Sequence, residues 1–99
     1  MANVIFRQKS IDDLNKIWNY TSEKWSELQA DKYYASLELA CAQIGKNPAL
    51  GKKYDRIKDN LMGLRIGRHI IFYQIVDKDI IEIIRILHER MDIENRLDK

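Results

Sequence analysis

The side chains best suited to chemistry gather toward the C-terminal end of the sequence. Arg65, Arg85 and Arg90 carry guanidinium groups, which bind phosphates and carboxylates through paired hydrogen bonds. His88 stands between two of these arginines, and a histidine titrates near neutrality, so it could act as an acid or a base. The alternative is that Arg85 and His88 only anchor the chain end, through hydrogen bonds to a sheet and to acids such as Asp92. Spacing alone leaves both interpretations open.

Other familiar kinds of chemical site are not supported. Gly45 and the Gly51–Lys53 run are separated by five residues, where a phosphate-binding loop has four. The segment that begins at His88 lacks the second histidine of a zinc-protease helix, and two histidines with one cysteine make a tetrahedral zinc site improbable. Cys41 falls in an apolar helical stripe, which indicates a buried structural thiol. We expect no metal, no cofactor and no catalytic residue.

The charge of the chain is mild as a whole but uneven along its length. Seventeen basic and fifteen acidic residues give a net charge of +2, too little to indicate a nucleic-acid-binding protein. The segment 52–69 holds six basic residues and two acidic ones, or +4, so the remainder carries −2. The plain interpretation of this segment is a solvated loop and strand edge.

Length and composition predict one globular domain over residues 1–99. Hydrophobic residues make up 45% of the chain and charged residues 32%, which excludes a disordered polar tail and a membrane protein. No signal peptide or membrane-spanning run is visible. Because a single cysteine suits a reducing compartment, we expect a cytoplasmic protein.

A strand and two helices are expected in the first half of the chain. Residues 3–7 are typical of a short strand. A helix should begin after Ser10 as N-cap, with Asp13 in the acidic position of a capping box. Its apolar positions recur at helical spacing as far as Trp25, which we place at the edge of the core with Trp18 inside it.

A second helix should follow after a short connection, with Ser26 as its N-cap. Its buried stripe is expected to include Ala30, Tyr33, Leu37, Ala40, Cys41 and Ile44. Gly45 fits the position just past a helix end, where a positive φ is usual, and Pro48 prevents continuation. The two helices should therefore form a hairpin.

Three strands are expected in the second half, at residues 61–66, 69–76 and 80–87. Residues 67–68 predict a type II′ turn and residues 77–79 a three-residue turn, so these strands should be antiparallel neighbours. In the last strand, alternation places Leu87 on the same face as Ile81 and Ile83, and places Ile86 on the other face with Ile84. Because both faces are apolar, this strand should be central, and a partner chain is expected to cover the second face.

A short helix over 92–97 completes the expected architecture. The fold class is α+β in β-α-α-β-β-β order, with a helical hairpin packed on a small, mostly antiparallel sheet.

Several segments of the chain together resemble a known protein family. The run from Arg85 to Asp92, Arg-Ile-Leu-His-Glu-Arg-Met-Asp, resembles the C-terminal signature of the ParE toxins within the RelE/ParE superfamily. Residues 64–73 resemble the central hairpin of that family. Further similar segments are Ile17-Trp18, Lys24-Trp25, Asn47-Pro48, Gly51-Lys52 and Asp55-Arg56-Ile57. The ordered set covers roughly ninety residues of the chain.

This resemblance implies the toxin of a type II toxin–antitoxin pair, with functions such as growth arrest and plasmid stabilisation. It further implies neutralisation by a ParD-type antitoxin in a hetero-oligomer, and inhibition of DNA gyrase without enzymatic activity. No sequence-specific binding of nucleic acid is expected. The residues that we expect to inhibit the target are Arg65, Arg85, His88, Arg90 and Met91. The residues that we expect to bind the antitoxin are Trp18, Trp25, Tyr34, Arg56 and Arg68.

Two alternatives stay open. RelE-type relatives cut mRNA on the ribosome with basic residues and usually a tyrosine near the C-terminus. Arg65 and His88 match that pattern, but Glu89, Arg90, Met91 and Asp92 stand where the tyrosine is expected. A net charge of +2 also argues mildly against extensive contact with ribosomal RNA. The second alternative is a non-toxic homologue that only binds its antitoxin.

Overall fold

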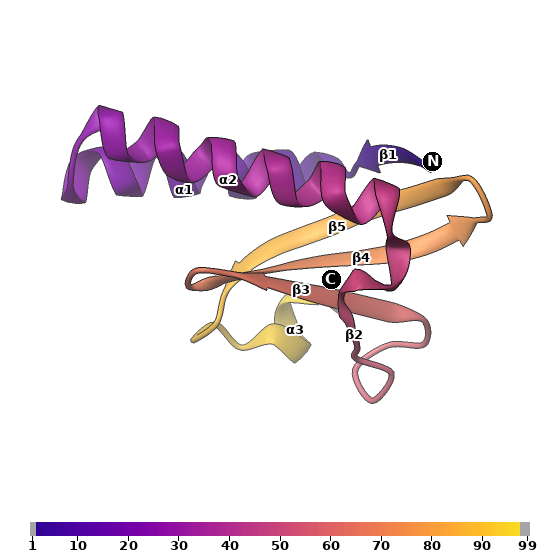
Figure 1. The fold of residues 1–99 in the computed structure, drawn as a ribbon. Helices are drawn as coiled ribbons and strands as arrows, with labels where there is room; N and C mark the ends of the chain where they lie inside the picture. The colour runs from indigo at the N-terminus through magenta and orange to yellow at the C-terminus, as the bar shows by residue number, and fades with distance from the viewer. Residues whose placement is uncertain (1, 98–99) are drawn as a thin grey trace.

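A computed structural model describes residues 2–97, and its two long helices follow the predicted apolar spacing. α1 spans Gln8–Lys24 and α2 spans Glu27–Lys46. The Ser26 side chain accepts the backbone N–H of Gln29 at 3.0 Å, so this residue is the predicted N-cap of α2. The helices lie side by side as an antiparallel hairpin (Figure 1). Within the described residues, no helix has the length and apolar character needed to cross a membrane.

The second layer is a sheet of five strands, which are β1 (Asn3–Phe6), β2 (Lys52–Lys53), β3 (Leu61–Ile66), β4 (His69–Asp77) and β5 (Ile80–His88). Their order is β1-β5-β4-β3-β2, with β1 parallel to β5 and the other neighbours antiparallel. The α1–α2 hairpin connects β1 to the rest and covers one face of the sheet (Figure 1). The α+β class and the central position of β5 are as predicted.

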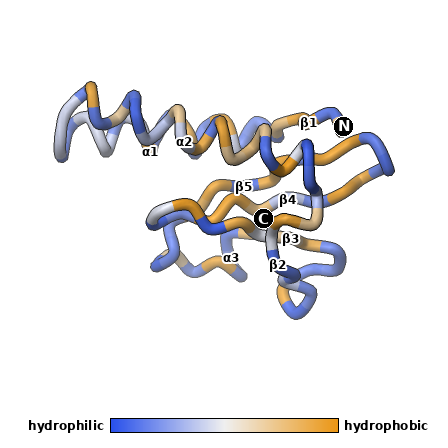
Figure 2. The backbone as a smooth tube through the Cα atoms, in the orientation of Figure 1, coloured by the Kyte–Doolittle hydropathy of each residue, from blue (hydrophilic) through white to orange (hydrophobic). Residues whose placement is uncertain are grey.

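The main core lies between the helices and the sheet. Apolar side chains from the inner faces of α1 and α2 meet isoleucines of β4 and β5 there. Figure 2 shows the corresponding hydrophobic stretches along both strands. The buried residues of this core include Leu14, Ile17, Leu37, Ala40, Cys41, Ile44, Ile71, Ile81, Ile83 and Ile86. The predicted buried stripe of α2 is confirmed, although Tyr33 is only half-buried.

The chain covers the second face of its own sheet, so the expectation of a partner chain there was wrong. A second cluster of buried residues packs Phe72 and Ile84 against Leu97. Leu97 belongs to α3 (Ile93–Leu97), the predicted C-terminal helix. Tyr54, from the connection between β2 and β3, meets Phe72 edge to face with ring centroids 5.2 Å apart. The second face is therefore covered by α3 and by the connection between β2 and β3, two short segments that helical periodicity did not predict to lie there.

A bulge in β5 overturns the predicted alternation of its side chains. Ile86 belongs to the core beneath the helices, while Leu87 packs with Ile84 on the opposite face. The cause is that the pairing of β5 with β4 skips Ile84, because Ile83 and Arg85 pair with consecutive residues of β4. One extra residue reverses the two faces for the rest of a strand.

The start of α1 also differs from the prediction, because Ser10 is not the N-cap. The helix begins earlier, at Gln8, and Arg7 precedes it without a capping side-chain hydrogen bond. Ser10 is fully buried in the first turn, where its hydroxyl donates to the Arg7 carbonyl at 2.7 Å. Asp13 does not cap the helix either, because its carboxylate is bound elsewhere.

Asp13 joins α1 to the end of β5. Its Oδ1 and Oδ2 accept hydrogen bonds from the Arg85 guanidinium at 2.9 and 2.8 Å, and Oδ2 also accepts the backbone N–H of Ile86 at 2.9 Å. β1 pairs with β5 only as far as Phe6 opposite Ile83. The carboxylate therefore satisfies a backbone donor on the stretch of β5 that β1 no longer reaches. Its hydrogen bonds with Arg85 raise the pKa of the guanidinium further.

Gly45 was predicted just past the end of α2, but it lies inside the helix. It is buried, it has no positive φ, and its carbonyl accepts the N–H of Ala2 at 3.0 Å. A Cβ at this position would stand 2.8 Å from Cγ2 of Val4. Glycine is needed here because β1 approaches the helix closely. The chain leaves α2 at Asn47, and η1 (Pro48–Leu50) follows.

The turns between strands agree with the predictions in one case and differ in the other. Gly67 has a φ of 56°, and Arg68 has a negative φ, as a type II′ turn requires. The connection between β4 and β5 is a two-residue loop, because Asp77 still pairs with Ile80. The three-residue turn predicted for 77–79 was therefore one residue too long.

We predict that Asp13→Ala lowers the free energy of unfolding by about 3–5 kcal/mol. The substitution leaves the Arg85 guanidinium, in a side chain only 13% exposed, without its carboxylate. The neighbouring exposed Asp12 serves as control, and Asp12→Ala should cost less than about 1 kcal/mol. Urea unfolding followed by circular dichroism measures both. Equal stability of the two variants would show that Asp13 does not hold β5.

Candidate functional site

The far end of the helical hairpin and one end of the sheet enclose a cleft of about 740 Å³, which we call the tip cleft. The β3–β4 turn and the end of β5 lie together because His69 pairs with His88 across the strands. The helical hairpin extends past this end of the sheet, so the connection between α1 and α2 lies beyond the β3–β4 turn (Figure 1). The side chains that give the tip cleft its character are Tyr20, Trp25, Tyr33, Arg68, His88 and Arg90.

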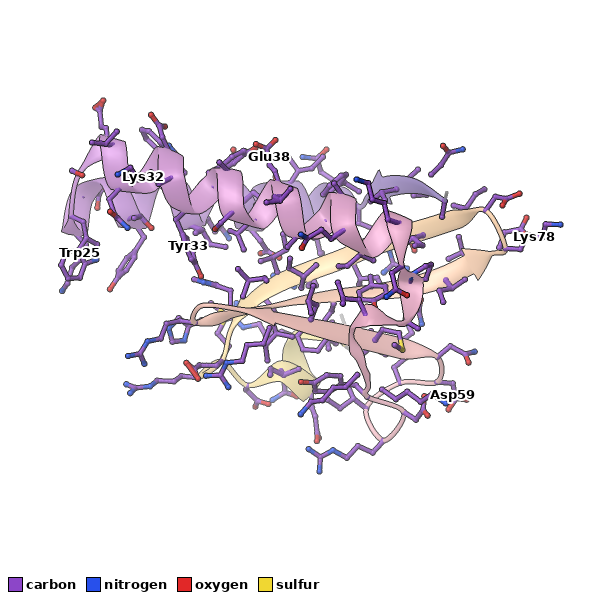
Figure 3. The ribbon with its side chains drawn as sticks, viewed as in Figure 1. Trp25, Lys32, Tyr33, Glu38, Asp59 and Lys78 are labelled. Atoms are coloured by element: carbon purple, nitrogen blue, oxygen red, sulfur yellow. The ribbon has the colours of Figure 1, made fainter. Side chains whose placement is uncertain are left out.

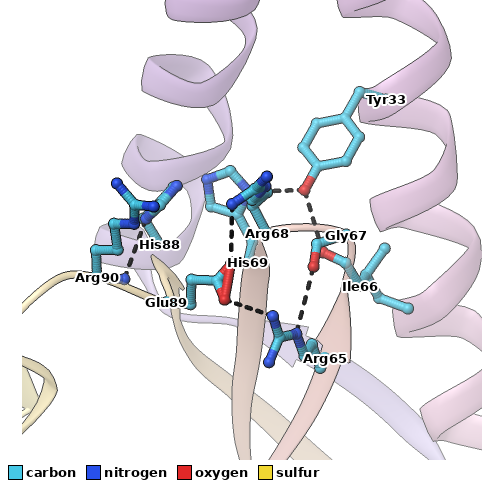
Figure 4. A network of polar contacts seen from close by, with 9 residues as sticks. All are labelled: Tyr33, Arg65, Ile66, Gly67, Arg68, His69, His88, Glu89 and Arg90. Atoms are coloured by element: carbon cyan, nitrogen blue, oxygen red, sulfur yellow. Dashed lines mark hydrogen bonds and ion pairs between the residues drawn. The ribbon is translucent and has the colours of Figure 1, made fainter.

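One wall of the tip cleft is a hydrogen-bonded pair, Tyr33 and His69 (Figure 4). The Tyr33 hydroxyl lies 3.1 Å from the Ile66 carbonyl and 2.7 Å from Nδ1 of His69. Since the hydroxyl has one proton, all three atoms are satisfied when it donates to the carbonyl and accepts from Nδ1–H. Nε2 of His69 is then an acceptor. Burial raises the pKa of Tyr33, so the phenol stays protonated.

His88 stands edge-on to His69, with ring centroids 5.3 Å apart. Its Nδ1 accepts the backbone N–H of Arg90 at 3.1 Å, which places the proton of the neutral ring on Nε2. Burial, with a further contribution from His88, lowers the pKa of His69 to about 4. His69 is therefore neutral near pH 7, and the pair presents a hydrogen-bond acceptor beside a donor.

Two arginines pair with a single carboxylate at this end of the sheet, and a third arginine lies nearby. Glu89 contacts the guanidinium of Arg65 at hydrogen-bond distance, and Nη1 of Arg68 lies 3.8 Å from its other oxygen. The guanidinium of Arg90 has no carboxylate partner within residues 2–97. Figure 4 shows these groups around the β3–β4 turn. The formal charge at this end is therefore positive. Although Arg65 and Arg68 pair with Glu89, their side chains stay largely exposed to solvent.

An apolar recess of about 280 Å³ adjoins the tip cleft and shares Tyr20 and both histidines with it. Ile17 and Ile86 line it, and Met91, which is 40% exposed, lies at its edge. A methionine adapts its shape to many apolar partners. This end of the molecule can therefore accept an apolar group as well as anions.

A separate groove of about 650 Å³ runs along the outer face of the helical hairpin. Trp18 and Tyr34 line it, and the Trp18 indole N–H donates to Asp31 at 2.9 Å. Two leucines of α2, Leu28 and Leu39, are also largely exposed on the helical layer. We call this feature the helix groove.

The structure brings together most of the residues expected to inhibit the target. His88, Arg90 and Met91 line the tip cleft and its recess. Arg65 lies outside both and is linked to this end of the sheet through its contact with Glu89. Arg85 is separate, since it binds Asp13 and donates to the Arg96 carbonyl at 3.3 Å. Its contacts are those of an anchor for the chain end, with Asp13 as the acid where the sequence suggested Asp92.

The residues expected to bind the antitoxin do not form one surface. Trp18 and Tyr34 share the helix groove, whereas Trp25 and Arg68 line the tip cleft. Trp25 was expected at the edge of the core, but it is 74% exposed because α1 ends at Lys24 and the chain turns there. Arg56 belongs to the connection that covers the opposite face of the sheet (Figure 1).

Three prominent side chains of the tip cleft were missed by the sequence analysis, namely Tyr20, Tyr33 and His69. Glu89, which binds Arg65 at this end of the sheet, was missed as well. Tyr33 counted only as part of a core stripe, and its hydroxyl could not be assigned a partner 36 residues away. His69 had a usable signal, because the predicted turn at 67–68 places it first on its strand. Aligning the two predicted hairpins would have put His69 opposite His88.

Cys41 and the metal-ligating residue types do not form a further chemical site within the described residues. Cys41 is buried, as predicted, and burial raises the pKa of its thiol to about 12, which keeps it unreactive. Residues 2–97 contain no group of three or more histidine, cysteine or carboxylate side chains that could hold a metal ion. The features that remain are suited to binding.

We predict that His69 makes the fold less stable in mild acid. Its pKa of about 4 lies below the ordinary 6.5, so the unfolded chain binds a proton in this interval that the native state excludes. Stability should fall as pH drops from about 6.5 toward 4, and His69→Gln should reduce that fall. Urea midpoints measured across this range provide the comparison. A variant curve as steep as the wild-type curve would contradict the assignment.

Comparisons with known proteins agree with this architecture. A model of the ParE toxin of type II toxin–antitoxin systems, parDE, matches residues 4–93. The chain is 33% identical to Toxin ParE1 of Mycobacterium tuberculosis over 84 residues, covering 85% of this chain and 86% of that protein. It is 29% identical to Toxin ParE of Escherichia coli over 97 residues, covering 98% and 94%.

A solved structure gives independent support for the fold. The protein described as a chromosomal ParDE TA system from P. aeruginosa superposes with a TM-score of 0.76 at 15% identity. The match covers 89% of this chain and 96% of that one. The family model spans nearly the whole described chain, with relatives that align over most of their length. The chain is therefore a member of the ParE toxin family, the toxins of ParDE type II toxin–antitoxin systems.

Proposed function

We propose that this ParE-family toxin inhibits DNA gyrase by binding it, acting in the cytoplasm and without enzymatic activity of its own. The observation that carries the proposal is the tip cleft with its exposed cations and the adjoining apolar recess. A surface that combines exposed guanidinium groups with an adaptable apolar side chain, Met91, is well suited to a protein partner. Membership of the ParE toxin family supports the proposal that the partner is the cellular target of a toxin.

Binding fits the chemistry of the cleft better than catalysis does. A general acid or base works best when its pKa lies near the operating pH. The pKa of His69 is about 4, and its Nδ1 is already engaged by Tyr33. The two carboxylates whose charges act on His69, Asp13 and Glu89, are held by Arg85 and Arg65. The state of these residues favours a surface that binds a partner rather than a centre that cleaves mRNA.

The predicted target residues divide into two roles in this proposal. Arg65, His88, Arg90 and Met91 contact the target. Arg85 acts by positioning, because its bonds to Asp13 and to the Arg96 carbonyl fix the end of β5 and α3 on either side of the residues that follow His88.

A ParD-type antitoxin is the proposed neutralising partner, in a hetero-oligomer. An amphipathic antitoxin helix would lie in the helix groove against Trp18 and Tyr34. An acidic extension passing Trp25 at the hairpin tip would reach Arg68 and cover the tip cleft. Arg56 lies on the other face of the sheet, so contact with it requires the partner to pass around the β2 edge.

We predict that the purified toxin inhibits gyrase supercoiling and that Arg90→Ala weakens inhibition by about tenfold or more. Removing a central arginine from a protein interface commonly costs more than about 1.4 kcal/mol, which is tenfold in affinity. Lys78→Ala is the matched control, because Lys78 lies at the opposite end of the molecule from Trp25 (Figure 3). The measurement is the toxin concentration that halves supercoiling.

The same preparation should be added to ribosomes programmed with mRNA. Transcripts cut on ribosomes, with gyrase unaffected, would overturn the proposal in favour of a RelE-like ribonuclease. Inactivity in both assays, together with tight antitoxin binding, would instead identify a non-toxic homologue.

We predict that Tyr34→Ala weakens antitoxin binding by about tenfold or more, because it removes an aromatic wall of the helix groove. Tyr20→Ala is the comparison variant, since Tyr20 is also on the helical hairpin but lines the tip cleft, where the acidic extension and not the antitoxin helix would lie. Calorimetric titration of each toxin variant with the ParD-type protein provides the affinities. If Tyr20→Ala has the larger effect, the antitoxin helix does not occupy the helix groove.

A further inference from the structure

The tip cleft exposes two large aromatic side chains to solvent. Trp25 is 74% exposed and Tyr20 is 64% exposed, and both line the same cleft. The described residues provide no hydrogen-bond acceptor for the Trp25 indole N–H. Figure 3 shows Trp25 at the end of the helical hairpin, clear of the sheet. Large aromatic side chains that stay in water are available to stack on a planar ligand.

Two guanidinium groups in the same cleft are available for anions. The side chain of Arg68 is 69% exposed, and its nearest carboxylate oxygen, on Glu89, lies 3.8 Å away, too far for a hydrogen bond. Glu89 is instead occupied by Arg65. Arg90 is exposed and has no carboxylate partner within residues 2–97. The cleft thus holds two cations near an aromatic platform.

We propose that the tip cleft binds a single strand of nucleic acid, with its phosphates on Arg68 and Arg90 and one unpaired base stacked on Trp25. Arginines that contact the backbone next to exposed aromatic rings are the general pattern of single-strand binding. The cleft volume of about 740 Å³ lies within the range of sites for nucleotide-sized groups.

An acidic peptide satisfies fewer features of the cleft. It would pair with the arginines but would leave the indole face without a planar partner. The neutral histidine pair offers Nε2 of His69 as an acceptor beside Nε2–H of His88 as a donor. A base edge or a sugar hydroxyl can use both, whereas a carboxylate can use only the donor. A base paired inside a duplex cannot stack on Trp25, so the ligand is single-stranded.

The mild charge of the chain sets the strength of this interaction. Stacking does not distinguish the bases by the hydrogen-bonding groups on their edges, so we expect binding to tolerate many sequences. With two phosphates neutralised, affinity should fall about sevenfold between 50 and 200 mM salt. The inference does not depend on gyrase as the target, since a single chain forms the whole cleft.

The test is fluorescence anisotropy with short labelled oligothymidylate and oligouridylate, using the purified full-length toxin without gyrase. We expect both strands to bind, and tighter binding of oligouridylate would identify RNA as the preferred source of the phosphate. Trp25→Ala should weaken binding at least about fivefold, since stacking is lost, whereas Trp25→Phe should retain most of it. Lys78→Ala should bind as the wild type does.

Three outcomes would overturn the proposal. The first is no oligonucleotide binding at low salt, and the second is binding that Trp25→Ala leaves unchanged. The third is an acidic peptide of equal charge that binds more tightly and displaces the oligonucleotide, which would make the cleft a protein-binding site. Because Trp25→Ala is measured without gyrase, a failure here is distinguishable from a failure of gyrase inhibition.

Discussion

The hydrogen bonds of one carboxylate, that of Asp13, hold α1 against the end of β5. The tip cleft is built on this arrangement. β1 stops pairing with β5 after Ile83, and Asp13 takes over by accepting the N–H of Ile86. The same carboxylate holds the Arg85 guanidinium, which in turn donates to the Arg96 carbonyl in α3. A side chain on α1 thereby connects the helical layer, the central strand and the C-terminal helix. Such a buried pair contributes through geometry, because removing either partner leaves an uncompensated charge.

The tip cleft depends on this connection, because the chain leaves the sheet after His88, two residues beyond the Ile86 N–H that Asp13 binds. The cleft has walls from two layers, with Tyr33 and Trp25 from the helical hairpin and the histidine pair from the sheet. The hydrogen bond from His69 to Tyr33 joins the two walls and orients the His69 ring, while burial keeps this histidine neutral. The cleft is therefore organised by neutral hydrogen bonds, while its charge comes from arginines at the rim.

The basic segment 52–69, conspicuous in the sequence, is not one surface in the folded protein. Its first part includes β2 and the connection that covers the second face of the sheet. Its last part includes β3 and the β3–β4 turn, where Arg65 and Arg68 contact Glu89 and Arg68 lines the tip cleft. A count of charges along the chain therefore overstated the charge at any one place. The arginine that completes the cleft, Arg90, comes from outside the segment.

The sequence by itself determined the elements whose signals are local: two amphipathic helices with Ser26 as a cap, three strands, the turn at Gly67, and the α+β order. Periodicity and turn chemistry act over a few residues, so one chain segment contains them in full. The tertiary structure decided the role of Asp13, the helical Gly45, the bulge at Ile84 and the meeting of Tyr33 with His69. All but the bulge are contacts between residues more than thirty positions apart, and the bulge follows from how two strands pair. No local pattern can specify them, because they exist only once the helices have packed on the sheet.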